Sequence, residues 1–148
     1  MSFLEENKAI IRRLFEAVNK RDPASLDELM APDYVDHALQ LHGLEANKQV
    51  LTMFLKGFPD WHETIQGIIA EGDKVWVRFK STGTHAGEFR GLAPTGNKFT
   101  ETGVLIYRIV DGKIAEGWTV SDLLDFFKQL GVIEYTEKGK KLFPEDAK

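Results

Sequence analysis

Acidic residues and histidines are the side chains of this chain best suited to chemistry, because the sequence contains no cysteine. Asp36 and His37 are adjacent, and a carboxylate can act as a general base while an imidazole, His37 or else His85, orients it. Glu101 and Asp122 are further candidate acids near expected strand ends. Each of these residues could instead have a purely structural role. Asp36 can cap a turn and Asp122 can cap a helix. The imidazoles can form hydrogen bonds with the backbone, and Glu101 can lie at a solvent-exposed strand end.

The histidines do not predict a metal site. His37, His42, His62 and His85 are separated by 5, 20 and 23 residues, which matches no compact ligand pattern. The absence of cysteine excludes disulfides, thiolate nucleophiles and cysteine-bound metals. The net charge is −4 and no basic block stands out, which disfavours nucleic acid. We therefore expect neither a metal nor a nucleic-acid partner.

Tryptophans are candidates for a ligand-binding wall, because an indole ring stacks on flat molecules while its N–H holds a polar atom. Trp118, next to Thr119, is the strongest candidate, and Trp61 is another. The alternative for both is a place in the hydrophobic core.

The chain is expected to be one cytoplasmic domain without a membrane partner. No apolar run approaches the ~20 residues that span a bilayer. The first residues, Met1 to Glu6, carry acids where a signal peptide carries bases. The length of 148 residues fits a single domain over 1–148, with a core at about 3–131 and a charged tail at 132–148.

The hydrophobic spacing places helices first and strands afterwards. Helices are expected at about 3–20, from Asp22-Pro23 to before Pro32, at about 43–58, and from Ser121 or Asp122 to Gly131. Strands are expected at 33–38, 64–70, 75–80 with an extension through 83–91, 99–109 and 114–120. Turns are expected at 71–73 and 111–112.

This order predicts an α+β fold. We expect a strongly curved, mostly antiparallel sheet that wraps on the N-terminal helices as an α+β barrel and encloses a cone-shaped cavity. Cavities of this kind bind small molecules.

Six segments follow one another with a characteristic spacing: Pro32–Ala38, Phe58–Trp61, Ile69–Val75, Thr82–Phe89, Gly91–Gly96 and Asp111–Trp118. From about Asn7 to Gly131 the chain thereby resembles the SnoaL-like polyketide cyclases, often labelled ester cyclases. The resemblance implies the cystatin-like α+β cone fold that ketosteroid isomerase and scytalone dehydratase share. It also implies an intramolecular aldol ring closure without metal or organic cofactor.

The family's catalytic residues are missing at the matching positions. The resemblance implies that a buried Asp near the end of the last strand acts as acid and base, and that a His on the preceding strand assists it. Here the His position falls on Leu105 and the Asp position on Thr119, and neither side chain can take a proton from carbon at neutral pH. The resemblance therefore leaves Asp36 or Asp122 as a relocated base.

Three hypotheses remain open from the sequence. The first is an enzyme that cyclises, isomerises or dehydrates a small hydrophobic, carbonyl-bearing molecule. The second is a non-catalytic binder, favoured by the loss of both family groups. The third is a scaffold with a vestigial pocket, and a homodimer through the sheet is the expected assembly. The expected substrate-binding residues are His37, Trp61, His85, Glu101, Leu105, Trp118 and Thr119.

Overall fold

Helices occupy the start of the chain and long strands the rest, as the hydrophobic spacing predicts. In the computed structural model, which describes residues 1–144, the N-terminal part contains α1 (Phe3–Asn19), the 3-10 helix η1 (Pro23–Ser25), α2 (Leu26–Leu29), β1 (Met30–Asp36), β2 (Leu41–His42) and α3 (Leu44–Gly57). The remainder contains β3 (His62–Glu71), β4 (Lys74–Thr84), β5 (Lys98–Val110), β6 (Lys113–Ser121), α4 (Leu123–Gln129) and α5 (Glu137–Leu142).

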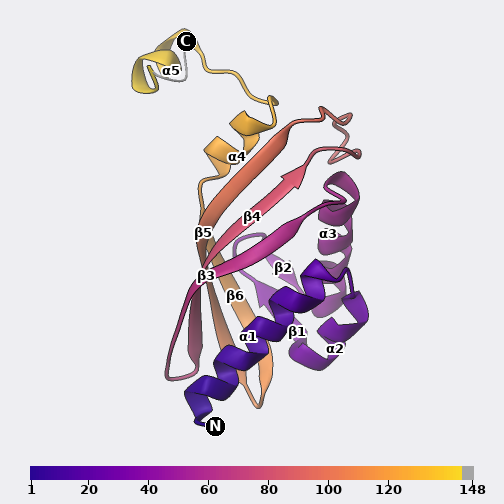
Figure 1. The fold of residues 1–148 in the computed structure, drawn as a ribbon, viewed down its shortest axis with the longest axis vertical. Coiled ribbons are helices and arrows are strands. Elements are labelled where there is room, and N and C mark those ends of the chain that lie inside the picture. The colour runs from indigo at the N-terminus through magenta and orange to yellow at the C-terminus, as the bar shows by residue number, and fades with distance from the viewer. Residues whose placement is uncertain (145–148) are drawn as a thin grey trace.

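The helix starts follow local capping chemistry. The Ser2 side chain accepts a hydrogen bond from the backbone N–H of Glu5 at the start of α1. Asp22 caps η1, with Pro23 at its first position, where the missing N–H costs nothing. The apolar side of α1 then lies against β3 and β4 (Figure 1).

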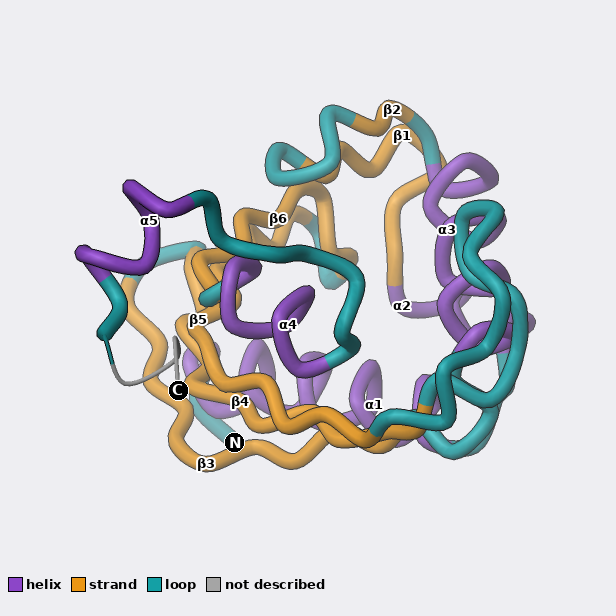
Figure 2. Tube along the Cα trace, turned by 90° about the horizontal axis from the view of Figure 1, so that it is seen from above, coloured by secondary structure: helices purple, strands orange, loops and turns teal. Residues whose placement is uncertain are grey.

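Six strands form one sheet in the order β2-β1-β6-β5-β4-β3. The pairing of β1 with β6 is parallel, and the other pairings are antiparallel. Seen from above, the strands follow an arc, with α3 across from the long strands (Figure 2). The expected barrel is wrong, because the edge strands β2 and β3 do not pair with each other. The α+β class is confirmed, but the sheet is open.

Aromatic rings fill the core at one end of the sheet. Phe58 is completely buried, and its ring centroid lies within 5.2–5.9 Å of the rings of Trp61, His85, Phe89, Phe99 and Phe126. The edge-to-face and tilted geometries are those that aromatic quadrupoles favour. This cluster joins the end of α3 to β5 and α4.

The segment after β4 differs from the sequence prediction. We expected residues 83–91 to extend the strand, but β4 ends at Thr84 and residues 85–97 form a loop. The backbone N–H groups of Ala86 and Gly87 donate to the carbonyl of Gly57 at the end of α3. A Cβ on Gly87 would lie 2.1 Å from the Lys56 carbonyl oxygen. The glycine thus marks a close approach to α3, and this contact bends the chain away from the sheet.

Two smaller differences concern the ends of elements. Met30 was expected in a helix but begins β1, and Pro32, which cannot donate a ladder hydrogen bond, lies where the β1–β6 register is irregular. In the tail, the short helix α5 was not predicted, and none of its residues is buried. Residues 145–148 of the expected tail lie outside the described residues. Within residues 1–144, every helix is too short or too polar to span a bilayer.

Candidate functional site

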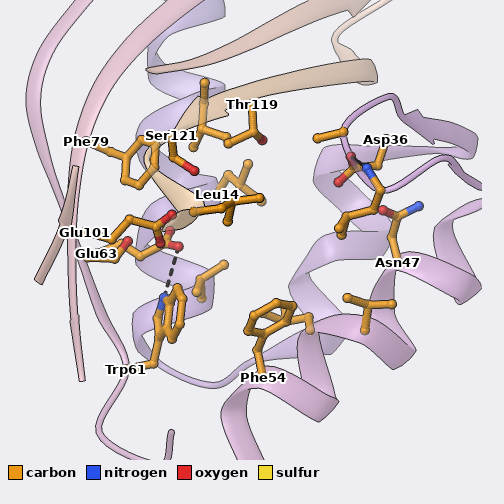
Figure 3. A pocket seen from close by; sticks show the side chains of 18 of the residues that line it. Leu14, Asp36, Asn47, Phe54, Trp61, Glu63, Phe79, Glu101, Thr119 and Ser121 are labelled. Atoms are coloured by element: carbon orange, nitrogen blue, oxygen red, sulfur yellow. Dashed lines mark hydrogen bonds between the residues drawn. The ribbon is translucent and has the colours of Figure 1, made fainter. Parts of the chain in front are cut away.

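A cavity of about 540 Å³ lies between the inner face of the sheet and the helices. Its walls are mostly apolar and come from α1, α3, the long strands and α4. Figure 3 shows part of this lining. The apolar residues of the wall include Leu14, Val18, Leu51, Phe54, Phe79, Leu105, Phe126 and Phe127. Pockets of this size and lining hold small hydrophobic molecules, which a few polar groups orient.

The polar groups of the cavity gather in two places. Glu63, Glu101 and Ser121 lie on the sheet side, and Asp36 and Asn47 lie across from them (Figure 3). In Figure 3 the side chains of Glu63 and Glu101 lie next to each other, and both carboxyl groups are directed into the cavity. A ligand between the two places would contact acids at both ends.

Strand register brings the two glutamates together. Glu63 of β3 pairs with Ser81 of β4, and Ser81 pairs with Glu101 of β5. Because neighbours across a sheet point to the same face, these three side chains form one row on the inner face. The Ser81 hydroxyl is buried and has no hydrogen-bond partner among the described residues.

Glu63 is held by its surroundings at both backbone and side chain. The indole Nε1–H of Trp61 donates to Glu63 Oε1 over 3.0 Å (Figure 3). The Asn19 side chain accepts from the Glu63 backbone N–H and donates to the Glu63 carbonyl, both over 2.8 Å. These contacts fix the direction in which the carboxyl group enters the cavity.

Both glutamates hold their protons more tightly than in water. Burial raises the pKa of Glu63, the charge of Glu101 raises it further, and the Trp61 hydrogen bond lowers it. Burial also raises the pKa of Glu101, against the hydrogen bond from Ser121 and together with the charge of Asp122. Neither carboxylate forms an ion pair with a basic residue in the described part of the chain. Two neighbouring carboxyl groups with raised pKa values can divide the roles, so that a protonated member serves as acid and an ionised member as base.

Asp36 faces the cavity from the opposite wall. Its Oδ1 accepts a hydrogen bond from the Leu39 backbone N–H over 3.0 Å, which is the turn-capping role that the sequence also allowed. Tyr34 and Tyr107 line the same space, and burial raises the pKa of both phenols, so both stay neutral. Asp36 is therefore a polar wall group that is already engaged by backbone.

Five of the residues expected at the site line the cavity: Asp36, Trp61, Glu101, Leu105 and Thr119. Leu105 and Thr119 face each other directly across β5 and β6. The two positions at which the family resemblance placed catalytic groups are thus neighbours in the wall.

Four expected residues lie elsewhere. The Asp122 carboxylate accepts from the Asp125 N–H and caps α4. His37 and Trp118 stack on each other with centroids 4.8 Å apart, and His37 Nε2 lies 2.9 Å from Glu116 Oε2. His85 is buried in the aromatic cluster, where its Nδ1 bonds to Thr95. Because these side chains are engaged outside the cavity lining, the structure does not place them at the site.

Glu63, Asn47 and Arg90 line the cavity but were missed in the sequence. The strand containing Glu63 was expected to begin at Thr64, whereas β3 begins at His62. The available signal was the spacing Trp61-x-Glu63, since residues two apart on a strand share a face. In the described residues, no group of three or more His, Asp or Glu side chains is arranged to hold a metal ion.

Comparison with known families and structures gives consistent results. Residues 8–130 match the family of SnoaL-like polyketide cyclases. The chain is 32% identical to aklanonic acid methyl ester cyclase DauD of Streptomyces sp. (strain C5), over 91% of this chain and 88% of that protein. It is 27% identical to nogalonic acid methyl ester cyclase of Streptomyces nogalater, over 80% and 92% of the two chains.

Solved structures show the same architecture. IdmH of Streptomyces antibioticus has a TM-score of 0.73 and 38% identity, covering 85% of this chain and 99% of that one. TsrD of Streptomyces laurentii has a TM-score of 0.81 and 25% identity, covering 90% and 99%.

Proposed function

This chain belongs to the SnoaL-like polyketide cyclase family, and we propose that it closes a ring in a small hydrophobic, carbonyl-bearing molecule by cofactor-independent acid/base chemistry. The observation that carries this proposal is the pair of neighbouring carboxyl groups, Glu63 and Glu101, in a mostly apolar cavity. Raised carboxyl pKa values bring a general acid and a general base closer to neutral pH.

The reaction balances without a further reagent. The ionised carboxylate of the pair takes a proton from the carbon next to a carbonyl group, which forms an enolate. The enolate carbon attacks a second carbonyl of the same molecule, and the protonated carboxyl donates its proton to the oxygen that becomes a hydroxyl. The pair then holds the proton taken from carbon, so its proton count is unchanged. The apolar wall strengthens both transfers by excluding water.

In this proposal the acid and the base are Glu63 and Glu101, and not Asp36 or Asp122. Asp122 is engaged as the α4 cap, and the Asp36 carboxylate is partly occupied by the Leu39 N–H. Glu101 shares an inner face with Leu105, four residues further along β5. A base at Glu101 would therefore act on a molecule held against Leu105 and Thr119.

Proton abstraction can be tested directly, with aklanonic acid methyl ester and the corresponding free acid as probes. In D₂O, enolate formation exchanges a hydrogen next to the carbonyl for deuterium, which mass spectrometry detects. Ring closure gives an isomer of the same elemental composition, separable by chromatography. We expect exchange or cyclisation faster than in buffer. If both probes remain at the buffer rate, the proposed activity is wrong.

A binding role without turnover is the second candidate, and the wall positions Leu105 and Thr119 favour it. In that case the cavity holds its ligand but the glutamate pair makes no transfer. Binding of the same probes without exchange would distinguish this role.

We also propose a homodimer through the outer face of the sheet. Ile69, Trp76, Ile106 and Trp118 form one row across β3 to β6. Ile69 is 68% exposed and Trp76 is 45% exposed. A contiguous apolar row of this kind supports an interface between subunits.

A further inference from the structure

One cationic side chain enters a cavity wall that otherwise carries acids. Arg90 is the single basic residue in the lining found among residues 1–144, together with Asp36, Glu63 and Glu101. It lies in the loop between β4 and β5, which is fixed to the end of α3.

A tight turn sets the position of Arg90. Phe89 and Leu92 exchange backbone hydrogen bonds of 3.1 and 2.9 Å, so that Arg90 and Gly91 form the two-residue loop of a small hairpin. Arg90 has φ +50° and Gly91 has φ +81°. Glycine takes this conformation freely, but arginine does so rarely and at a cost. Strain of this kind at a cavity wall points to a functional side chain.

The guanidinium group of Arg90 has no acidic partner among residues 1–144. Its Cζ atom lies 5.8 Å from the Phe54 ring centroid and 5.2 Å from that of Phe89. No hydrogen bond or ion pair joins it to a described residue. Two aromatic faces therefore steady the planar group while its N–H donors remain available.

We propose that Arg90 binds an ionised carboxylate on the molecule that occupies the cavity, so that the substrate is a free acid and not an ester. The inference rests on the proposed function and adds the substrate class. Phe54, over which Arg90 lies, is on the α3 side of the cavity, and the glutamate pair is on the sheet side (Figure 3). The carboxylate would face Arg90 while the reacting carbonyl faces the pair.

The charge of the wall favours a carboxylate over other anions. A guanidinium group matches the planar carboxylate with two parallel hydrogen bonds. A phosphate dianion carries two negative charges, and Arg90 could neutralise only one of them. The second charge would lie in a cavity that also contains three acidic side chains. A neutral ester offers no charge and leaves the Arg90 donors only weakly used. The cyclases DauD and nogalonic acid methyl ester cyclase are named for methyl esters, so a free-acid substrate would distinguish this chain from them.

Binding of 2-naphthoate and methyl 2-naphthoate, two flat probes that differ in charge, tests this inference by calorimetry. We expect the wild-type protein to bind the acid about tenfold more tightly than the ester, since a charge-assisted contact exceeds a neutral one by roughly that factor. Arg90→Met should lose this preference and keep its affinity for the ester. Arg90→Lys should keep part of it, because the charge remains without the planar fork.

Arg78→Met is the matched control, because this substitution removes the same charge outside the cavity. Arg78 lies on the outer side of β4 and pairs with Val104 of β5. This variant should bind both probes as the wild type does. Equal wild-type affinities, or an Arg90→Met variant that weakens both probes alike, would overturn the inference and leave cavity binding intact. If neither probe binds the wild type, the inference falls together with the binding role from which it starts. Retained ester binding shows that each variant is folded.

Discussion

Glu101→Gln should remove most of the catalytic activity while leaving the fold intact. Glutamine has nearly the same shape, so the wall beside Leu105 is kept, but it can neither accept the proton from carbon nor supply one. Loss of a positioned general acid or base costs about 10²–10⁴-fold in rate. At about 1.4 kcal/mol per tenfold, this corresponds to roughly 3–5 kcal/mol of transition-state stabilisation.

The same substitution should increase stability at neutral pH. Burial raises the pKa of Glu101 in the folded chain, so the folded state binds its proton more tightly than the unfolded state does. Stability from this group is therefore fully present at low pH and is lost as the pH rises through the folded pKa. Glutamine imitates the protonated acid, and the free energy of unfolding should fall less with pH in the variant.

The assay combines turnover and unfolding on the same preparations. Deuterium exchange next to the carbonyl gives the rate, and urea denaturation at pH 5 and pH 8 gives the stability. Asp122→Asn is the control, because it removes a neighbouring carboxylate outside the cavity while asparagine caps a helix as well as aspartate does. Wild-type exchange rates in Glu101→Gln, or an equal loss in Asp122→Asn, would refute the assignment of the base.

Three further outcomes are expected. Trp61→Phe removes the hydrogen-bond donor to Glu63, which raises the pKa of Glu63. With Glu101 as the base, Glu63 is the acid, so the descending limb of the rate–pH profile should move to higher pH; an unmoved limb would separate Glu63 from the chemistry. Phe58→Ala empties the centre of the aromatic cluster and should cost about 3–5 kcal/mol in urea denaturation, and a cost below 1 kcal/mol would contradict the packing described. Trp76→Glu puts a charge in the outer row and should give monomers by light scattering; wild-type monomers would exclude the dimer.

Sequence patterns were informative where one face of an element is buried. Strict alternation along Val75–Lys80 and the Gly72 and Asp111-Gly112 turns correspond closely to β4, β5 and β6. The start of β3 was less visible, because His62, Glu63 and Thr64 are all polar. Of these three residues, Glu63 is the one whose side chain lines the cavity. The alternation of hydrophobic residues that marks a strand is therefore missing at the functional residue itself.

Long-range contacts explain what remained hidden. The sequence could not show that the chain leaves the sheet at His85, since the cause is a contact between Gly87 and the end of α3, about 30 residues earlier. The sequence also left open whether Asp122 caps a helix or reaches the pocket. It could not show that Glu63 and Glu101 lie in one row, because that depends on the register across three strands. Leu105 and Thr119, the positions to which the resemblance points, are neighbours in the cavity wall, but the resemblance gave no indication of Glu63.

The parallel pairing of β1 with β6 also determines when the cavity can form. β1 is made early, yet its partner residues Ile114 to Gly117 lie some 80 positions later in the chain. Closing so long a loop is entropically costly and tends to be slow. The strand that carries Asp36 should therefore dock late in folding and detach early in unfolding. A ligand that binds only the assembled cavity would hold this strand in place, and it would slow proteolysis of the whole chain.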